Sequence, residues 1–154
     1  MNIRISKRLL VALPLVGALA LGACEDDPTG LDEDHTEPAG LTITLSGQTI
    51  ATYSATTGWT GELEVEAGTE TAHLDVTFLA EDGDAIELDD DVYLEVDIED
   101  ESIAEFEQDT PGEFGGHLHG VAAGETDATF MLMHGAVGTG HADFVTTSVH
   151  VHVN

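Results

Sequence analysis

Six of the chain's eight histidines lie in residues 114–154, and their spacing is suited to binding a metal ion. Four of them form two His-x-His pairs, His117 with His119 and His150 with His152. Residues two apart on a strand point to the same side, so each pair presents two imidazole rings together. Imidazole is a good ligand for Zn²⁺, Cu²⁺ and Ni²⁺. Transition-metal binding is therefore the chemistry that these residues indicate.

A predicted hairpin between Met133 and Ala142 brings another set of these groups together. Its register pairs His134 with His141, and Asp143 follows on the same side of the strand as His141. The strand that carries the first His-x-His pair is expected to begin at the same end of the fold. We therefore predict a Zn²⁺ or Cu²⁺ site with ligands drawn from His134, His141, Asp143, His117 and His119.

The second His-x-His pair is expected to stand apart from this site. The same register places His150 and His152 opposite residues near 125 and 123, too far along the strand to share one ion with Met131 or Met133. A simpler interpretation of all the histidines stays open. In a chain almost without Lys and Arg, they are polar residues on exposed strands and bind no metal.

Calcium is a weaker alternative for the acidic loop that spans residues 81–91. Asp82 and Asp84, with Asp89 to Asp91, supply the hard oxygen ligands that Ca²⁺ prefers. They lack the fixed D-x-D-x-D-G spacing of a calcium loop, and the pair Asp82-Gly83 is typical of a simple turn.

The charge of the chain excludes several classes of function. It has 31 Asp and Glu against 3 Lys and Arg, and the three basic residues all lie within the first eight positions. A nucleic-acid-binding protein needs a basic surface, so this class is excluded. Of the 24 acids in residues 41–154, 16 lie in residues 81–113. The simplest interpretation of this density is solubility in a saline habitat.

The N-terminus is typical of an exported protein. A short basic segment ending at Arg8 precedes an apolar run from Leu9 to Ala23. Fifteen helical residues would span about 22 Å, which is short of a hydrocarbon core of about 30 Å. The run is therefore interpreted as a signal peptide rather than a permanent membrane span.

The end of that run resembles the cleavage box of bacterial lipoproteins, Leu21-Gly22-Ala23-Cys24. The resemblance implies that Cys24, the chain's only cysteine, becomes the lipid-bearing first residue. We predict a signal peptide over 1–23, a lipidated Cys and acidic disordered tether over 24–40, and a folded domain over 41–154. The expected location is the bacterial cell envelope, on its periplasmic or cell-surface side, with the lipid anchor in the membrane.

The domain is predicted to be all-β because its apolar residues alternate with polar ones. The sets expected to face the core include Leu74, Val76 and Phe78; Val92, Leu94, Val96 and Ile98; Phe130 and Leu132; and Val149, Val151 and Val153. Shorter strands are expected within 41–45, 50–53, 62–66, 103–106 and 116–121. A bulge is expected within 146–148, since Phe144 is out of phase with Val149.

Two segments resemble bacterial Ig-like domains of the group 2 type. They are Ser102-Ile103-Ala104-Glu105-Phe106 and, after a Gly-rich turn, Gly120-Val121-Ala122-Ala123-Gly124-Glu125-Thr126. The resemblance covers residues 69–153 and implies an Ig-like Greek-key β-sandwich of about seven to nine strands. One departure is that Tyr93 or Leu94 stands where the family usually has Trp. Such modules serve as adhesins, spacers and binding domains alike.

Enzyme activity is not expected. Gly116-His117-Leu118-His119-Gly120 resembles the copper-ligand strand of copper/zinc superoxide dismutases, but the disulfide, arginine and later ligands of those enzymes are missing. No G-x-S-x-G or H-E-x-x-H motif occurs in the sequence. We predict a binding module whose ligand is a divalent cation. The alternative is a structural or adhesive surface domain, whose partner would be another envelope or surface protein.

Overall fold

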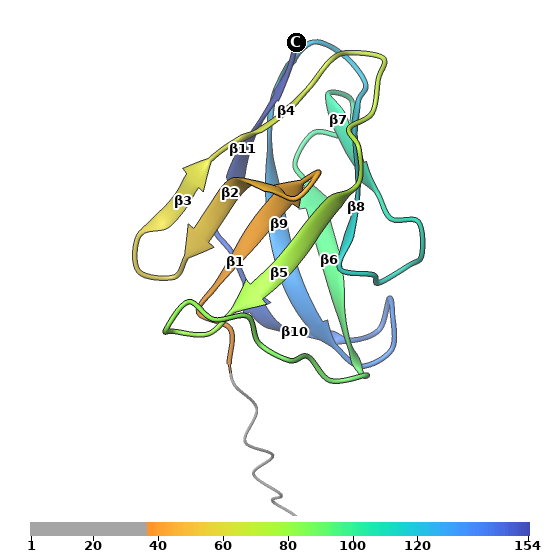
Figure 1. The fold of residues 1–154 in the computed structure, drawn as a ribbon. Coiled ribbons are helices and arrows are strands. Elements are labelled where there is room, and N and C mark those ends of the chain that lie inside the picture. Colours follow the sequence, from red (N-terminus) through yellow and green to blue (C-terminus); the bar gives the residue numbers. More distant parts are fainter. Residues whose placement is uncertain (1–36) are drawn as a thin grey trace, which may run out of the picture. The chain divides into compact units, whose positions relative to one another are not determined.

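A computed structural model describes residues 37–154, and within them the fold is entirely β. Residues 1–36 lie outside the described part, so the predicted signal peptide, Cys24 and most of the tether do too. Within residues 37–154, no helix could cross a membrane. Eleven strands follow one another (Figure 1): β1 (Gly40–Leu45), β2 (Gln48–Ser54), β3 (Gly58–Gly61), β4 (Leu63–Val65), β5 (Leu74–Leu79), β6 (Val92–Ile98), β7 (Ala104–Glu107), β8 (Gly115–Gly120), β9 (Gly124–His134), β10 (His141–Val145) and β11 (Val149–Val153).

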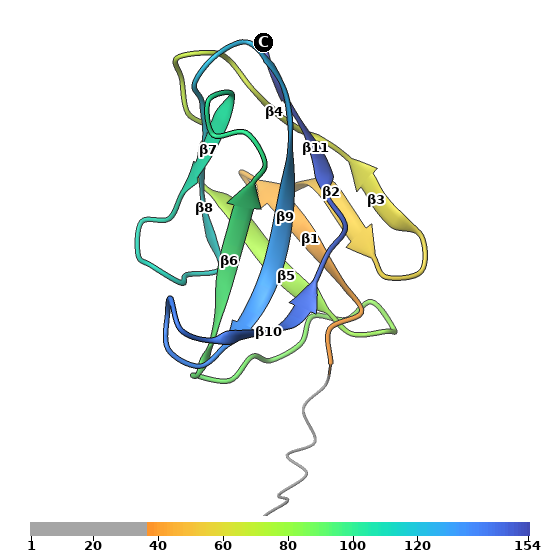
Figure 2. The same ribbon diagram turned by 180° about the vertical axis from the view of Figure 1, so that it is seen from behind.

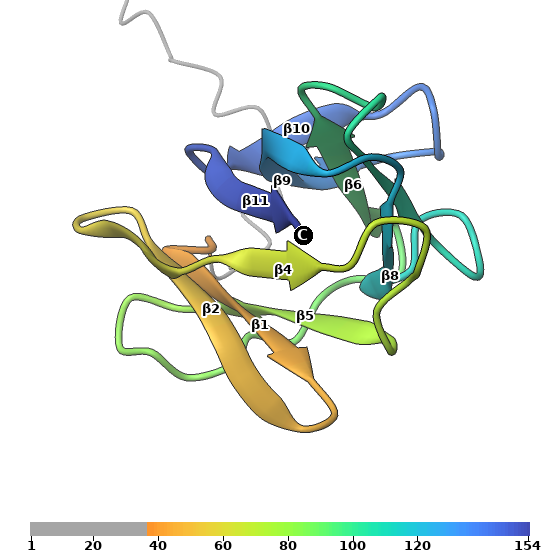
Figure 3. The same ribbon diagram turned by 90° about the horizontal axis from the view of Figure 1, so that it is seen from above.

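The strands form two sheets that pack face to face (Figure 3). The first has the order β3-β2-β1-β5-β8-β7. In the second, β9 is central: β6 pairs with one edge, while β10 and β11 pair with the two halves of the other edge. The strand β4 completes this sheet by pairing parallel to β11. The chain passes between the sheets five times, at the connections β3–β4, β4–β5, β5–β6, β6–β7 and β8–β9.

The predicted all-β sandwich is confirmed, with eleven strands instead of the expected seven to nine. Most residues predicted to face inward are buried, while Val92 and Val96 are partly buried. Leu74, Phe78, Phe130 and Val151, for example, are all 0–1% exposed. The strand β3 was not expected, because its four residues show no alternation of polar and apolar types. The expected last strand is divided into β10 and β11 at residues 146–148, where the bulge was predicted.

A second bulge, which the sequence did not indicate, lies within β10. His141 pairs with His134 as predicted, but the register shifts by one between Ala142 and Phe144. After the shift at 146–148, His150 pairs with Asp127 and His152 with Glu125. The partners of these two histidines therefore lie two residues beyond those expected, because each bulge adds one residue to the strand.

Aromatic side chains join the two sheets across the core. Seven of the chain's eight Phe, Tyr and Trp residues form a continuous series of ring contacts, with centroids 5.3–6.1 Å apart. Tilted and edge-to-face contacts at such distances add to the stabilisation that comes from burial. In order, the series is Phe106, Phe130, Trp59, Tyr53, Phe144, Phe78 and Phe114.

Tyr93 is the eighth aromatic residue, and its position differs from the prediction. The alternation of β6 places it on the outer face of the sheet, yet it is only 5% exposed. Gly112 lies against its ring and Gly140 against its hydroxyl group. Two loops therefore cover this part of the outer face, which is why an aromatic residue is accommodated there.

Candidate metal centre

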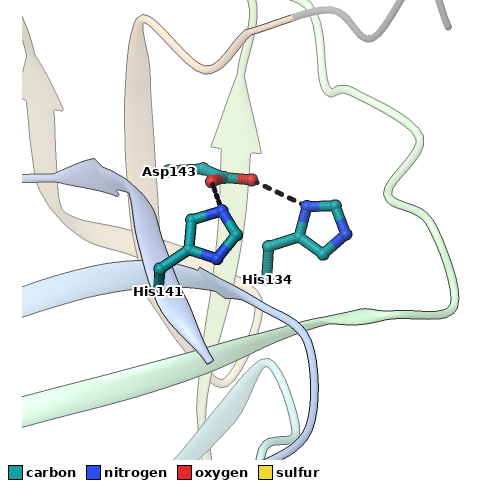
Figure 4. Close-up of side chains that lie close together, drawn as sticks. All are labelled: His134, His141 and Asp143. Carbon is teal, nitrogen blue, oxygen red and sulfur yellow. Dashed lines mark hydrogen bonds and ion pairs between the residues drawn. The ribbon is translucent and has the colours of Figure 1, made fainter. Parts of the chain in front are cut away.

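Two histidines and one aspartate meet where the β9–β10 hairpin leaves the sheet (Figure 4). His134 ends β9 and His141 begins β10, so their cross-strand pairing stacks the two rings with centroids 5.4 Å apart. Asp143 is the residue at the bulge. Its Oδ2 lies 3.2 Å from His134 Nδ1, and its Oδ1 lies 3.1 Å from His141 Nε2. One carboxylate thus joins both imidazoles.

Asp91 holds the other side of the His134 ring and was not among the predicted site residues. Its Oδ2 lies 2.9 Å from His134 Nε2. In metal sites, a carboxylate outside the ligand shell often accepts a hydrogen bond from the ring nitrogen that does not bind the metal. This hydrogen bond fixes the tautomer of the histidine. With Asp91 as that acceptor, His134 Nδ1 faces Asp143 and His141, and it becomes available as a ligand atom when it loses its proton.

The three ligand atoms have a spacing suited to one small metal ion. One atom from each of His134, His141 and Asp143 lies within 4.8 Å of the others. Tetrahedral Zn²⁺, with bonds of about 2.0–2.2 Å, places its ligand atoms about 3.4 Å apart. Three protein ligands leave a fourth position for water or a small molecule.

A cavity of about 450 Å³ adjoins this cluster, and His134 and Asp143 form part of its wall. Apolar side chains and carboxylates of the loop before β6 form much of the remainder. The loop connects β5 to β6 at the same end of the sandwich as β10 (Figures 1 and 2). Other lining residues are Glu37, Pro38, Ile86, Glu87, Leu88, Asp89, Val92, Leu132 and Ala142.

The structure does not bring His117 and His119 into this cluster, which corrects the predicted five-residue site. Both lie on β8, in the other sheet. His117 Nδ1 bonds to the Thr71 carbonyl, 3.0 Å away, while His119 Nε2 lies 3.2 Å from Glu107. The expectation that β8 starts at the hairpin end fails because β8 pairs with the beginning of β5, at Leu74 and Asp75.

A second His–carboxylate cluster was missed, since its residues come from separate segments. His73, Asp109 and Glu113 place one ligand atom each within 4.8 Å of one another. The ring of His117 is 5.3 Å from that of His73. No motif in the sequence marks this group. Only the excess of histidine and acid in the chain could have suggested it.

The loop considered for calcium has a turn at its start. Asp82 Oδ1 accepts the backbone N–H of Asp84 at 3.1 Å, and Gly83 between them has a φ of 88°. This is the turn that Asp82-Gly83 predicted. Asp91, at the other end of the loop, contacts His134 and does not join the other carboxylates of the loop in a cluster of oxygen ligands.

The contacts of His134 predict an unusual titration in the metal-free protein. The hydrogen bond and charge of Asp91, with a smaller effect of Asp143, raise the pKa of His134 above its usual value. Protonated His134 stabilises the folded protein. This contribution is complete below the pKa of His134 in the unfolded chain, about 6.5, and is lost as pH rises through its pKa in the folded protein. NMR titration should show that Asp91→Asn lowers the His134 midpoint while Asp90→Asn leaves it in place. Equal midpoints in parent and Asp91→Asn would contradict the assignment.

Similarity to known proteins is limited to solved structures. No protein-family model matches the chain, and no curated protein matches it. Among solved structures, the chain is similar to one described as "Crystal structure of the S-layer protein SbsC domains 4 and 5", with 19% identity and a TM-score of 0.43. The match covers 75% of this chain and 53% of that one, about half its length.

Proposed function

We propose that this protein is a lipid-anchored module of the bacterial cell envelope that binds a divalent transition-metal ion, Zn²⁺ or Cu²⁺. Its role is to bind rather than to catalyse. The ligands are His134, His141 and Asp143, and Asp91 orients the first of them. The observation that carries the proposal is the position of Asp143, whose two oxygens each lie within 3.2 Å of a different imidazole.

The surroundings of the site support binding of a cation. Several carboxylates line the adjoining cavity, and residues 9–154 contain no Lys or Arg that would oppose a positive ion. An exported protein also meets metal ions directly outside the cytoplasm. The cavity gives water or a small ligand room to approach the fourth coordination position.

Calorimetric titration of the chelator-treated protein with Zn²⁺ and with Cu²⁺ tests the proposal. We expect a saturable binding step that either His134→Ala or His141→Ala removes. His150→Ala is the matched control, because His150 also lies near two carboxylates, Glu125 at 3.8 Å and Asp127 at 3.6 Å. Equal loss in the control, or no stoichiometric binding by the parent protein, would contradict the site.

A structural or adhesive surface domain is the second candidate, and one observation favours it. Six of the seven histidines in residues 37–154 lie within 4.0 Å of a carboxylate. In a domain without Lys or Arg, these pairs are the available side-chain ion pairs, and each forms only when its imidazole is protonated. Chelation separates the two functions: a metal-binding module should lose its ion and several degrees of melting temperature, while a purely adhesive domain should be unaffected.

A further inference from the structure

We infer that the protein has a second metal site, independent of the first, on the side of the sandwich where the β7–β8 loop meets β5 and β8. Its ligands are His73, His117, Asp109 and Glu113. Four protein ligands make a closed site of the structural type, whereas the three at the β9–β10 hairpin leave a position open.

The first argument is the tautomer of His117. Its Nδ1 lies 3.0 Å from the backbone carbonyl of Thr71, which can only accept a hydrogen bond. Nδ1 must therefore carry the proton, and the neutral ring presents its lone pair at Nε2. That atom lies 3.7 Å from Asp109 Oδ2. A backbone carbonyl that fixes the far nitrogen is the usual outer partner of a ligating histidine.

His73 has the corresponding arrangement. Asp75 Oδ1 lies 3.5 Å from its Nδ1, and Glu113 Oε1 lies 3.9 Å from its Nε2. The ring rests directly on Gly115, where an added Cβ would clash with His73 Cε1. A residue without a side chain at this place allows the ring to sit close to β8. The rings of His73 and His117 meet edge to face, 5.3 Å apart.

The two carboxylates come from a loop that its own hydrogen bonds hold in shape. Glu113 Oε1 accepts the backbone N–H groups of Asp109, at 2.5 Å, and Thr110, at 3.2 Å. Gln108 donates to the carbonyls of Leu94 and Glu113 and accepts from the N–H of Gly112. Glu113 is accordingly only 28% exposed. The loop therefore holds the Glu113 carboxylate and the backbone of Asp109 beside the histidine pair before any ion binds, which lowers the entropic cost of binding.

These ligands belong to elements that are distant in the sequence. An ion at this position would tie the β7–β8 loop to the segment before β5 and to β8 itself. Because such a site is absent from the unfolded chain, metal binding there would stabilise the fold. The inference does not depend on the site at His134, since the two clusters share no residue.

Titration of the full-length, chelator-treated protein with Zn²⁺ alone tests this inference, with Co²⁺ as a spectroscopic probe. We expect two equivalents of Zn²⁺ in the parent. His73→Ala should remove one equivalent and His134→Ala the other. Asp109→Asn should also remove the second site, and it changes a side chain that is 66% exposed, so the fold is retained. Asp75→Asn should weaken only the second site, by about 10–100-fold.

The variants distinguish failure of this inference from failure of the proposed function. A single equivalent that His134→Ala removes and His73→Ala retains would overturn the second site and leave the first intact. A single equivalent with the opposite dependence would support the second site and reject the first. An equal, partial loss of binding in His73→Ala, His134→Ala and His150→Ala would show general binding to histidine and acid, which overturns both. In the expected case, the Co²⁺ spectrum of His134→Ala retains the strong visible bands of four-coordinate cobalt.

Discussion

Replacement of Phe130 by alanine is expected to destabilise the domain more than any other single truncation in the core. Phe130 is 0% exposed and its ring contacts Trp59 and Phe106, so it connects the second sheet to two strands of the first. Truncation of a buried Phe costs about 3–5 kcal/mol, from lost apolar burial and the cavity that remains. Small domains are stable by only about 5–15 kcal/mol in total.

Thermal unfolding followed by circular dichroism measures this effect. For a domain of this size, the loss corresponds to a fall of about 10–20 °C in melting temperature. Val121→Ala is a suitable control, because Val121 is 48% exposed and its truncation should change stability by less than about 0.5 kcal/mol. A melting temperature of Phe130→Ala equal to that of Val121→Ala would show that the aromatic series does not hold the sheets together.

Replacement of Cys24 by serine is expected to move the protein completely from the membrane fraction to the soluble envelope fraction. The proposed anchor is a lipid on the cysteine thiol, which serine cannot replace. Acyl chains hold a protein at a membrane by about 0.8 kcal/mol per buried CH₂ group. Residues 25–154 carry all 31 acids, which anionic lipids repel.

Fractionation with radiolabelled fatty acid measures both the location and the lipid. The parent should carry label and sediment with membranes, while Cys24→Ser carries none. Ser46→Ala, a change in the described domain, serves as a control that leaves anchoring unchanged. If the serine variant stays in the membrane with residues 1–23 attached, those residues act as an uncleaved anchor and the lipoprotein proposal fails.

The sequence by itself determined the class of fold and one pair of site residues. Period-two alternation defines which face of a strand is apolar, so Phe78, Phe130 and Val151 could be assigned to the core without knowledge of their partners. The pairing of His134 with His141 was equally accessible, because a hairpin connects neighbouring strands and its register follows from local spacing.

Tertiary structure decided how the chemistry is assembled. A bulge fixes where the Asp143 carboxylate sits, and a loop from another part of the chain brings Asp91 to His134, 43 residues away. His73 and His117 meet only because β5 pairs with β8. Alternation specifies the faces of strands, whereas the choice of neighbouring strands and the packing of loops depend on the whole core. For that reason the sequence placed His117 and His119 at the hairpin site, while the fold places His117 beside His73.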